Sequence, residues 1–240
     1  MIFLFDVDGT LTPPRQPMVD EFREFFVHWV SVQQMFSNEV FFVTGSDREK
    51  TIEQVGTSLY MQVDGSYQNC GNQLYKKDKL IKESHWELPK DLEKDIINLM
   101  RDSIWYGTAD GNIEHRVGMV NISTVGRDCD QVKRNVYADW DSVMEERLYI
   151  VKQLKKKHQD LDFTIGGQIS IDIYPKGKDK SQVADEFKGE NQIVNRRDSL
   201  IFFGDSCHKG GNDHTLSHRC WVSYDVNSWK ETKSILETID

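Results

Sequence analysis

Two carboxylates near the start of the chain are the first residues whose types and spacing could support catalysis. Asp6 and Asp8 stand two residues apart, directly after the apolar run 2–5, and Gly9 follows them. Acids held this close repel each other unless they share a cation or a proton, and Mg²⁺ suits oxygen ligands beside a phosphate. A carboxylate can also attack phosphorus and form an aspartyl-phosphate. Alone, the pair is more typical of a helix cap and a turn, so its assignment depends on residues downstream.

Further polar residues follow later apolar runs. Thr44 and Ser46 come after the second run, Asp205 comes after a third, and Asp213 stands eight residues beyond it. Lys180 begins an expected helix and supplies a positive charge. Because the carboxyl ends of parallel strands meet at one sheet edge, these groups are expected to converge with the first two acids. Together they are the parts needed to move a phosphoryl group.

Buried strands and helices alternate at both ends of the chain and would position these residues. The apolar runs predict strands over 2–5, 40–43, 199–203 and 219–223. Helical patterns follow or precede them over 19–37, 48–59, 179–187 and 228–239. Such alternation predicts a parallel sheet with right-handed crossovers.

The middle of the chain shows a different pattern, in which hairpins alternate with helices. Hairpins are expected over 73–83, 113–123 and 163–174, and helices from Pro89, over 128–138 and over 142–159. This mixture is typical of a separate antiparallel layer. We therefore predict an α/β fold class: a doubly wound parallel sheet core with an inserted α+β cap domain of antiparallel sheet plus helices. The expected core segments are 1–76 and 176–240, and the expected cap is 77–175.

The composition narrows the classes of function. The chain has 240 residues and a formal net charge of -9, which argues against nucleic acid or a membrane surface as partner. It shows no signal peptide and no apolar stretch near the ~20 residues of a membrane span. The four scattered cysteines suit reduced thiols, so we expect a cytoplasmic protein. The seven histidines show no evident ligand spacing and are interpreted as surface or incidental residues.

Several motifs resemble those of a known superfamily. Residues 6–12 resemble the first motif of the haloacid dehalogenase (HAD) superfamily, and residues 204–205 with 212–213 resemble its last. Within that superfamily the chain is similar to the eukaryotic-type phosphomannomutases from its first strand to its final helix. The narrower resemblance is carried by Arg15 and by residues 116–123, 126–127 and 166–172, the last being the most specific.

The resemblance implies a HAD-like core and a mutase activity. Mannose 6-phosphate and mannose 1-phosphate would be interconverted through an aspartyl-phosphate and a hexose 1,6-bisphosphate, feeding GDP-mannose synthesis. The implied cofactors are Mg²⁺ and a hexose 1,6-bisphosphate as activator. The implied partners are a small-molecule sugar phosphate and a second copy of the chain, in a homodimer formed through the cap.

The resemblance also implies a role for each matching residue. Asp6 would be the nucleophile, Asp8 the general acid/base and Lys180 the residue that steadies the phosphoryl group. Mg²⁺ would be held by Asp6, Asp8, Asp205 and Asp213. Thr44 and Ser46 are the expected phosphate-binding hydroxyls. The expected sugar-phosphate ligands are Arg15, Arg116, Arg127, Arg134, Ser170 and Asp172.

Some positions depart from the pattern of the mutases. Thr44 stands where the family usually has glycine and is more typical of the phosphatases, Lys178 replaces a tryptophan, and 206–207 differ from the usual pair. The acidic stretch that normally follows Asp213 is missing. The alternative is therefore a HAD-type sugar-phosphate phosphatase, in which water removes the phosphoryl group. A catalytically inactive binding protein is disfavoured, because every charged catalytic position is retained.

Overall fold

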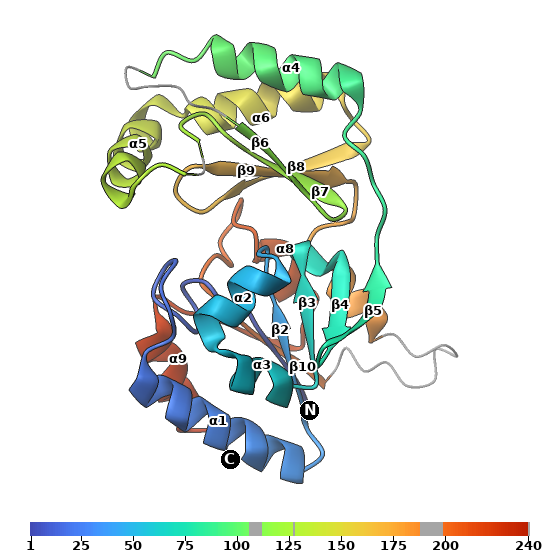
Figure 1. Cartoon of the computed structure of the whole chain (residues 1–240), viewed down its shortest axis with the longest axis vertical. Helices are drawn as coiled ribbons and strands as arrows, with labels where there is room; N and C mark the ends of the chain where they lie inside the picture. The colour runs from blue at the N-terminus through green and yellow to red at the C-terminus, as the bar shows by residue number, and fades with distance from the viewer. Residues whose placement is uncertain (106–111, 127, 188–198, 240) are drawn as a thin grey trace. The chain divides into compact units, whose positions relative to one another are not determined.

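The structure consists of two compact units. A computed structural model describes residues 1–105, 112–126, 128–187 and 199–239. The core unit comprises Met1–Ser84 and Lys178–Asp240, and the inserted unit comprises His85–Gly177 (Figure 1). The core unit is thus assembled from two chain segments, and the inserted unit is the stretch between them.

A sheet of seven strands, in the order β11-β10-β1-β2-β3-β4-β5, forms the centre of the core unit. Its strands are β1 (Ile2–Phe5), β2 (Glu39–Val43), β3 (Gly65–Gln68), β4 (Gln73–Lys76), β5 (Lys79–Glu83), β10 (Leu200–Gly204) and β11 (Val222–Asp225). β1 lies between β10 and β2 and pairs with both in parallel, so that Phe5 is in register with Phe203 and Phe42. The parallel strand ends predicted to meet therefore do meet, since the neighbours of β1 are the strands that precede Thr44 and Asp205.

Helices cover both faces of this sheet. They are α1 (Asp20–Met35), α2 (Arg48–Val55), α3 (Thr57–Gln62), α7 (Gln182–Glu186), α8 (His214–Ser217) and α9 (Trp229–Leu236), with the 3₁₀ turn η1 (Asn69–Gly71). Side chains of β1 alternate between two apolar clusters: Phe3 and Phe5 join α1 and α9 in one, and Ile2 and Leu4 join α7 and α8 in the other. β1 is buried on both faces, as its unbroken apolar sequence predicts.

The boundary of the insertion differs from the expected one. The hairpin of β4 and β5 occurs where it was predicted, but it extends the core sheet by antiparallel pairing with β3. The inserted unit consequently begins at His85 instead of residue 77 and ends at Gly177 instead of residue 175. The local pattern of a hairpin specifies two paired strands but does not specify the sheet that they join.

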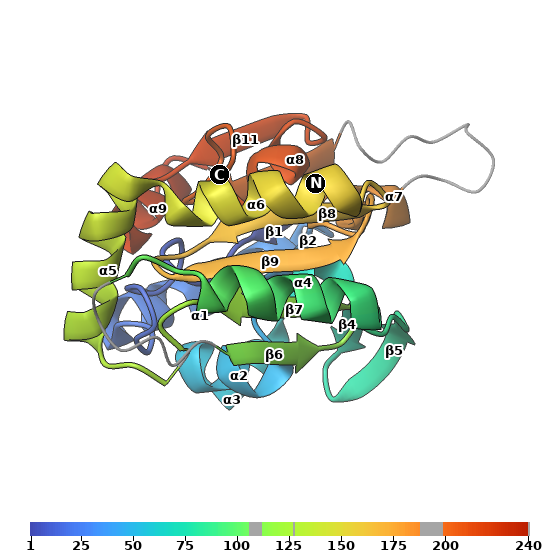
Figure 2. The ribbon, with the colours of Figure 1, turned by 90° about the horizontal axis from the view of Figure 1, so that it is seen from above.

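The inserted unit is an antiparallel sheet covered by helices. The sheet has the order β6-β7-β9-β8. Its elements are α4 (Lys90–Arg101), β6 (Asn112–Arg116), β7 (Met119–Ser123), α5 (Gln131–Met144), α6 (Glu146–Lys157), β8 (Leu161–Gly166) and β9 (Ser170–Pro175). Alternate residues of β7 and β9, such as Val120 and Ile173, form an apolar cluster with α4 and α6, which run side by side along the sheet (Figure 2). The opposite face of the sheet carries the polar residues.

Other element bounds shift by a few residues. The helix expected over 179–187 is shorter, because Lys180 and Ser181 form a turn before α7 begins. The last strand begins at Val222 instead of residue 219, and α5 and α6 are separated at Glu145, whose φ is 52°. Each helix in the described ranges is too short or too polar to traverse a lipid bilayer.

Candidate active site

A buried ammonium joins two of the predicted acids in the core unit. Lys180 Nζ donates to Asp6 Oδ1 and to Asp213 Oδ1, each at 2.6 Å. All three side chains are buried, and Lys180 is 1% exposed. Burial lowers the pKa of Lys180, but the carboxylates of Asp213 and Asp6 outweigh it and raise that pKa well above its usual value. The lysine is therefore a permanent positive charge beside the expected nucleophile.

A third acid leaves this cluster with an excess of negative charge. Carboxylate oxygens of Asp6, Asp205 and Asp213 lie within 4.8 Å of one another. Burial, and then the charge of Asp213, raises the pKa of Asp205 to about 6. Burial likewise raises the pKa of Asp6, with the charges of Asp213 and Asp205 adding to the effect against the opposing Lys180. Three carboxylates facing one ammonium fit a divalent cation with oxygen ligands, so the donor set matches the implied Mg²⁺.

Asp8 is held by two donors on one of its oxygens. Asp8 Oδ1 accepts hydrogen bonds from the backbone N–H of Arg15 and, at 2.9 Å, from Gln54 Nε2. The turn after β1 is closed by Leu11 and Thr12, whose N–H groups donate to the carbonyl of Val7. Both of these bonds end on Oδ1. They fix the orientation of the carboxyl group, as a residue that transfers protons requires.

Thr44 and Ser46 form one short turn at the end of β2. Thr44 Oγ1 accepts from the N–H of Ser46 at 3.1 Å, and the carbonyl of Thr44 accepts from Cys70 N at 2.9 Å. Asp47 then caps α2 by accepting from Lys50 N. The buried Thr44 hydroxyl thus shapes the turn, and either hydroxyl remains a proposed ligand for the transferred phosphate.

Glycine is required where the first and last motifs touch. Gly9 has φ +91°, and a Cβ there would lie 2.2 Å from Asp205 Oδ2. A Cβ on Gly204 would similarly lie 2.6 Å from Asp213 Oδ2. The absence of side chains at these two positions allows the acids from separate strand ends to pack against the turn.

Replacing Gly9 with alanine is expected to impair both folding and phosphoryl transfer. The new Cβ must displace the Asp205 carboxylate, and the positive φ adds about 1–2 kcal/mol of backbone strain. Turnover should fall about tenfold or more, measured with any accepted phosphate ester. Gly210→Ala is the matched control, because Gly210 has φ +95° but open space around its Cβ position. Equal losses of activity in the two variants would show that strain alone, and not the contact with Asp205, accounts for the effect.

The expected sugar-phosphate ligands occupy both units. Arg15 lies in the core unit with φ 59°. In the inserted unit, Arg134 is buried in α5 and its Nε donates to the carbonyl of Cys129 at 3.0 Å. Arg116 Nε donates to Glu114 Oε1 at 2.9 Å. Arg127 lies outside the described residues.

The remaining two predicted ligands lie on the polar face of the inserted sheet. Ser170 and Asp172 are two apart on β9 and both are buried. Asp172 is in register with Asn121 of β7, and Asn121 Nδ2 donates to Asp172 Oδ1 at 2.6 Å. Burial of an acid, an amide and a hydroxyl on one face is the composition expected of a surface that binds sugar hydroxyls.

Two amides contribute to the core site without any sequence signal. Gln54, buried in α2, holds Asp8 and also donates to Thr12 Oγ1 at 3.2 Å. Gln182 Nε2 donates to the carbonyls of Cys70 and Lys178, both at 2.9 Å, and so connects the turn that carries Lys180 to η1. Both act across large sequence separations, and no local spacing could have revealed them. Asn121 was missed for the same reason.

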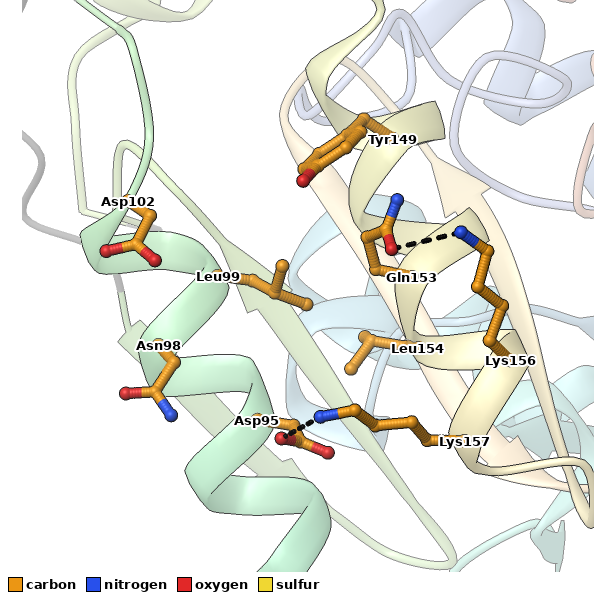
Figure 3. Close-up of a pocket in the computed structure, with 9 residues that line it drawn as sticks. All are labelled: Asp95, Asn98, Leu99, Asp102, Tyr149, Gln153, Leu154, Lys156 and Lys157. Carbon is orange, nitrogen blue, oxygen red and sulfur yellow. Dashed lines mark hydrogen bonds and ion pairs between the residues drawn. The ribbon is translucent and has the colours of Figure 1, made fainter.

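A groove between α4 and α6 is a different kind of surface (Figure 3). Its floor contains Leu99 and Leu154. The charged residues at its rim pair with each other or with neighbouring amides: Lys157 Nζ lies 2.8 Å from Asp95 Oδ1, and Lys156 Nζ donates to Gln153 Oε1. Because Asp95 neutralises Lys157 and Asp102 adds a further negative charge to the lining, the groove does not have the character of a phosphate site.

Comparison with solved structures places the fold in a known class. A HAD subclass IIB sugar phosphatase has a TM-score of 0.62 at 14% identity, covering 92% of this chain and 85% of its own. The C-terminal domain of the trehalose-6-phosphate phosphatase of C. albicans has a TM-score of 0.66 at 14% identity, covering 99% of this chain and 91% of its own. The fold is thus that of the HAD superfamily.

Sequence comparison gives the family. A model of the eukaryotic phosphomannomutase family matches residues 27–239. The phosphomannomutase of Triticum aestivum is 36% identical over 231 residues, covering 90% of this chain and 85% of the relative. This chain belongs to the eukaryotic phosphomannomutase family.

Proposed function

We propose that the protein interconverts mannose 6-phosphate and mannose 1-phosphate. The observation that carries the proposal is the buried contact of Lys180 with Asp6 and Asp213, at the sheet edge where Asp8 and Asp205 also lie. Relatives of the same family are named phosphomannomutases, and they match the chain over most of its length. The proposed phosphoryl transfer rests on the residues of the core unit, and the proposed substrate rests on the family relationship.

In the proposed reaction Asp6 carries the phosphoryl group. A sugar hydroxyl attacks phospho-Asp6, Asp8 takes the hydroxyl proton, and a hexose 1,6-bisphosphate forms while the Asp6 carboxylate is released. After the bisphosphate presents its other phosphate, Asp6 attacks that phosphorus and Asp8 returns the proton to the leaving sugar oxygen. Lys180 holds Asp6 in position throughout and offsets the charge of the phosphoryl oxygens. Trace bisphosphate is therefore the expected activator.

A divalent cation fits among the acids of this site. Asp6, Asp205 and the carbonyl of Asp8 would hold Mg²⁺, with Asp213 supporting. Bound there, Mg²⁺ would neutralise the charge of the incoming phosphate and of the acids themselves.

The second candidate is hydrolysis of a sugar phosphate. It is favoured by Thr44 and by the structural neighbours, which are a sugar phosphatase and a trehalose-6-phosphate phosphatase. Incubation with mannose 1-phosphate, Mg²⁺ and a trace of bisphosphate separates the two. Mannose 6-phosphate is the product expected of a mutase, whereas release of inorganic phosphate as the main product would overturn the proposed mutase activity.

Removing Arg134 is expected to lower the activity toward one substrate of the enzyme and to leave the activity toward another almost unchanged. A mutase must hold the second phosphate of its intermediate, and a charge-assisted hydrogen bond contributes roughly 1.5–3 kcal/mol. Arg134→Gln should therefore lower kcat/KM for mannose 1-phosphate about ten- to a hundredfold. Slow hydrolysis of an aryl phosphate, which has no second phosphate, should change little.

Arg101→Gln is the control for general effects of charge, because Arg101 is exposed at the end of α4. It should leave both activities unchanged. If Arg134→Gln lowers both activities in parallel, Arg134 has a structural role only, and the distal phosphate must be bound elsewhere.

A further inference from the structure

Two histidines on the surface of the core unit have the geometry of a chelating pair. His214 begins α8, and His218 is at its C-terminal cap, one turn later. Their ring centroids are 4.2 Å apart, with an angle of 62° between the planes. Residues four apart on a helix lie on the same face, and paired histidines at this spacing bind zinc in helical metal sites. We call these residues the α8 histidine pair.

Hydrogen bonds determine which nitrogen of each ring is available. His214 Nδ1 lies 2.9 Å from the carbonyl oxygen of Cys207, and His218 Nδ1 lies 2.8 Å from that of His214. A carbonyl only accepts, so each Nδ1 donates to it and carries the proton. Ser217 Oγ also lies 3.3 Å from His218 Nδ1, and because this hydroxyl donates to the His214 carbonyl at 2.9 Å, it can only accept from Nδ1. The lone pair is consequently on Nε2, which makes no hydrogen bond with a described residue in either ring. Metal-binding histidines are commonly oriented in this way, by donation from the other nitrogen to a carbonyl.

The pair is also accessible and differs chemically from the acidic cluster. His218 is exposed and His214 is partly so. Imidazole nitrogens favour zinc, copper and nickel, whereas a set of carboxylates favours magnesium. The formal charge of -9 attracts cations of both kinds to the protein.

We propose that the α8 histidine pair binds a transition-metal dication, represented by Zn²⁺, through both Nε2 atoms, at a site separate from Asp6, Asp205 and Asp213. Ligand distances near 2.0–2.1 Å require the two Nε2 atoms to lie ~3.3 Å apart, which two rings in contact can achieve by small rotations. Water would complete the coordination. The three residues between the histidines include no glutamate, so the site lacks the general base of hydrolytic zinc motifs and serves binding only.

Bound metal would act on the loop that precedes α8. His214 directly follows Asp213 and is bonded to the carbonyl of Cys207. A cation held by both rings therefore fixes the His214 ring, whose hydrogen bond to Cys207 closes the segment 207–213, and should raise the thermal stability of the core unit. This effect gives a measurement that is independent of catalysis.

The full-length protein is titrated with Zn²⁺ in saturating Mg²⁺, by calorimetry and by thermal melting. We expect one Zn²⁺ per chain and a higher Tm that Mg²⁺ does not abolish. His218→Ala and His218→Gln should each weaken binding about tenfold or more and remove the Tm increase. His208→Ala is the matched control: His208 is an exposed histidine of the same loop and should leave binding unchanged.

Three results would overturn the proposal. Zn²⁺ affinity unchanged in both His218 variants would exclude the pair as ligands. A Zn²⁺ signal that disappears as Mg²⁺ is raised would assign the cation to the carboxylates. An equal loss in His208→Ala would mean that the loop, and not the helix, holds the metal. None of these results bears on the mutase assay, so the site can fail while the proposed function stands.

Discussion

Phosphoryl transfer should fall about 10³-fold or more when Asp6 is replaced by asparagine, because an amide cannot attack phosphorus usefully. The variant should nevertheless fold. The Asp6 carboxylate is buried beside two other acids and its pKa is raised, so removal of one negative charge relieves repulsion. The loss of activity would then be chemical and not a consequence of unfolding.

Chemical trapping tests the same role directly. Wild-type protein incubated with labelled hexose bisphosphate should acquire a label that is stable in acid and released by hydroxylamine, as expected of an acyl phosphate. Asp6→Asn should acquire none. Label of equal strength on the variant would remove Asp6 from its assigned role, and Arg101→Gln, at an exposed position outside the site, provides a control in which the nucleophile is intact.

Lys180→Met is expected to cause the largest loss of stability. Methionine retains much of the volume of the side chain but removes the ammonium that lies 2.6 Å from both Asp6 and Asp213. Breaking a buried ion pair costs about 3–5 kcal/mol, because the remaining charge is left uncompensated. We expect a decrease of that order in the free energy of unfolding at pH 7.5, measured by urea denaturation without metal.

The deficit should shrink in acid. The pKa of Asp6 is already raised in the folded state, mainly by burial, and loss of Lys180 raises it further. A raised folded-state pKa gives stability that is present below the unfolded value near 3.8 and is lost as the pH rises through the folded value. The variant should therefore approach the wild type in stability as the pH falls towards 5. Adding Asp213→Asn should restore part of the loss at pH 7.5, and a deficit that does not vary with pH would contradict this explanation.

The acids of the site were predictable from sequence for a physical reason. Asp6 and Asp205 each follow a short apolar run, and strands buried on both faces are recognised by such runs alone. Parallel order then requires their carboxyl ends to meet at one edge. Lys180 was different: it was expected at the start of a helix but lies in a turn before α7, and its role beside the phosphoryl group came from the family resemblance.

Positions that depend on distant packing were not predictable. Gln54 acts on Asp8 from another helix, and the Asn121 amide acts on Asp172 from a neighbouring strand. The limits of the inserted unit were misplaced because β5 pairs within the core sheet. All seven histidines were interpreted from sequence as surface or incidental residues, and the pairing of His214 with His218 becomes evident only from their rings and from the carbonyls that hold them.

The division of the core unit into two chain segments has a consequence for synthesis of the protein. β1 completes its pairing only with β10, and Asp6 is bonded to Lys180, so these contacts cannot form until synthesis has passed Lys180 and then β10. The inserted unit is continuous in sequence and can fold first. We expect β1 to remain exposed in the nascent chain until β10 has been synthesised. The segment that carries β1 is therefore the stretch most dependent on chaperones during synthesis.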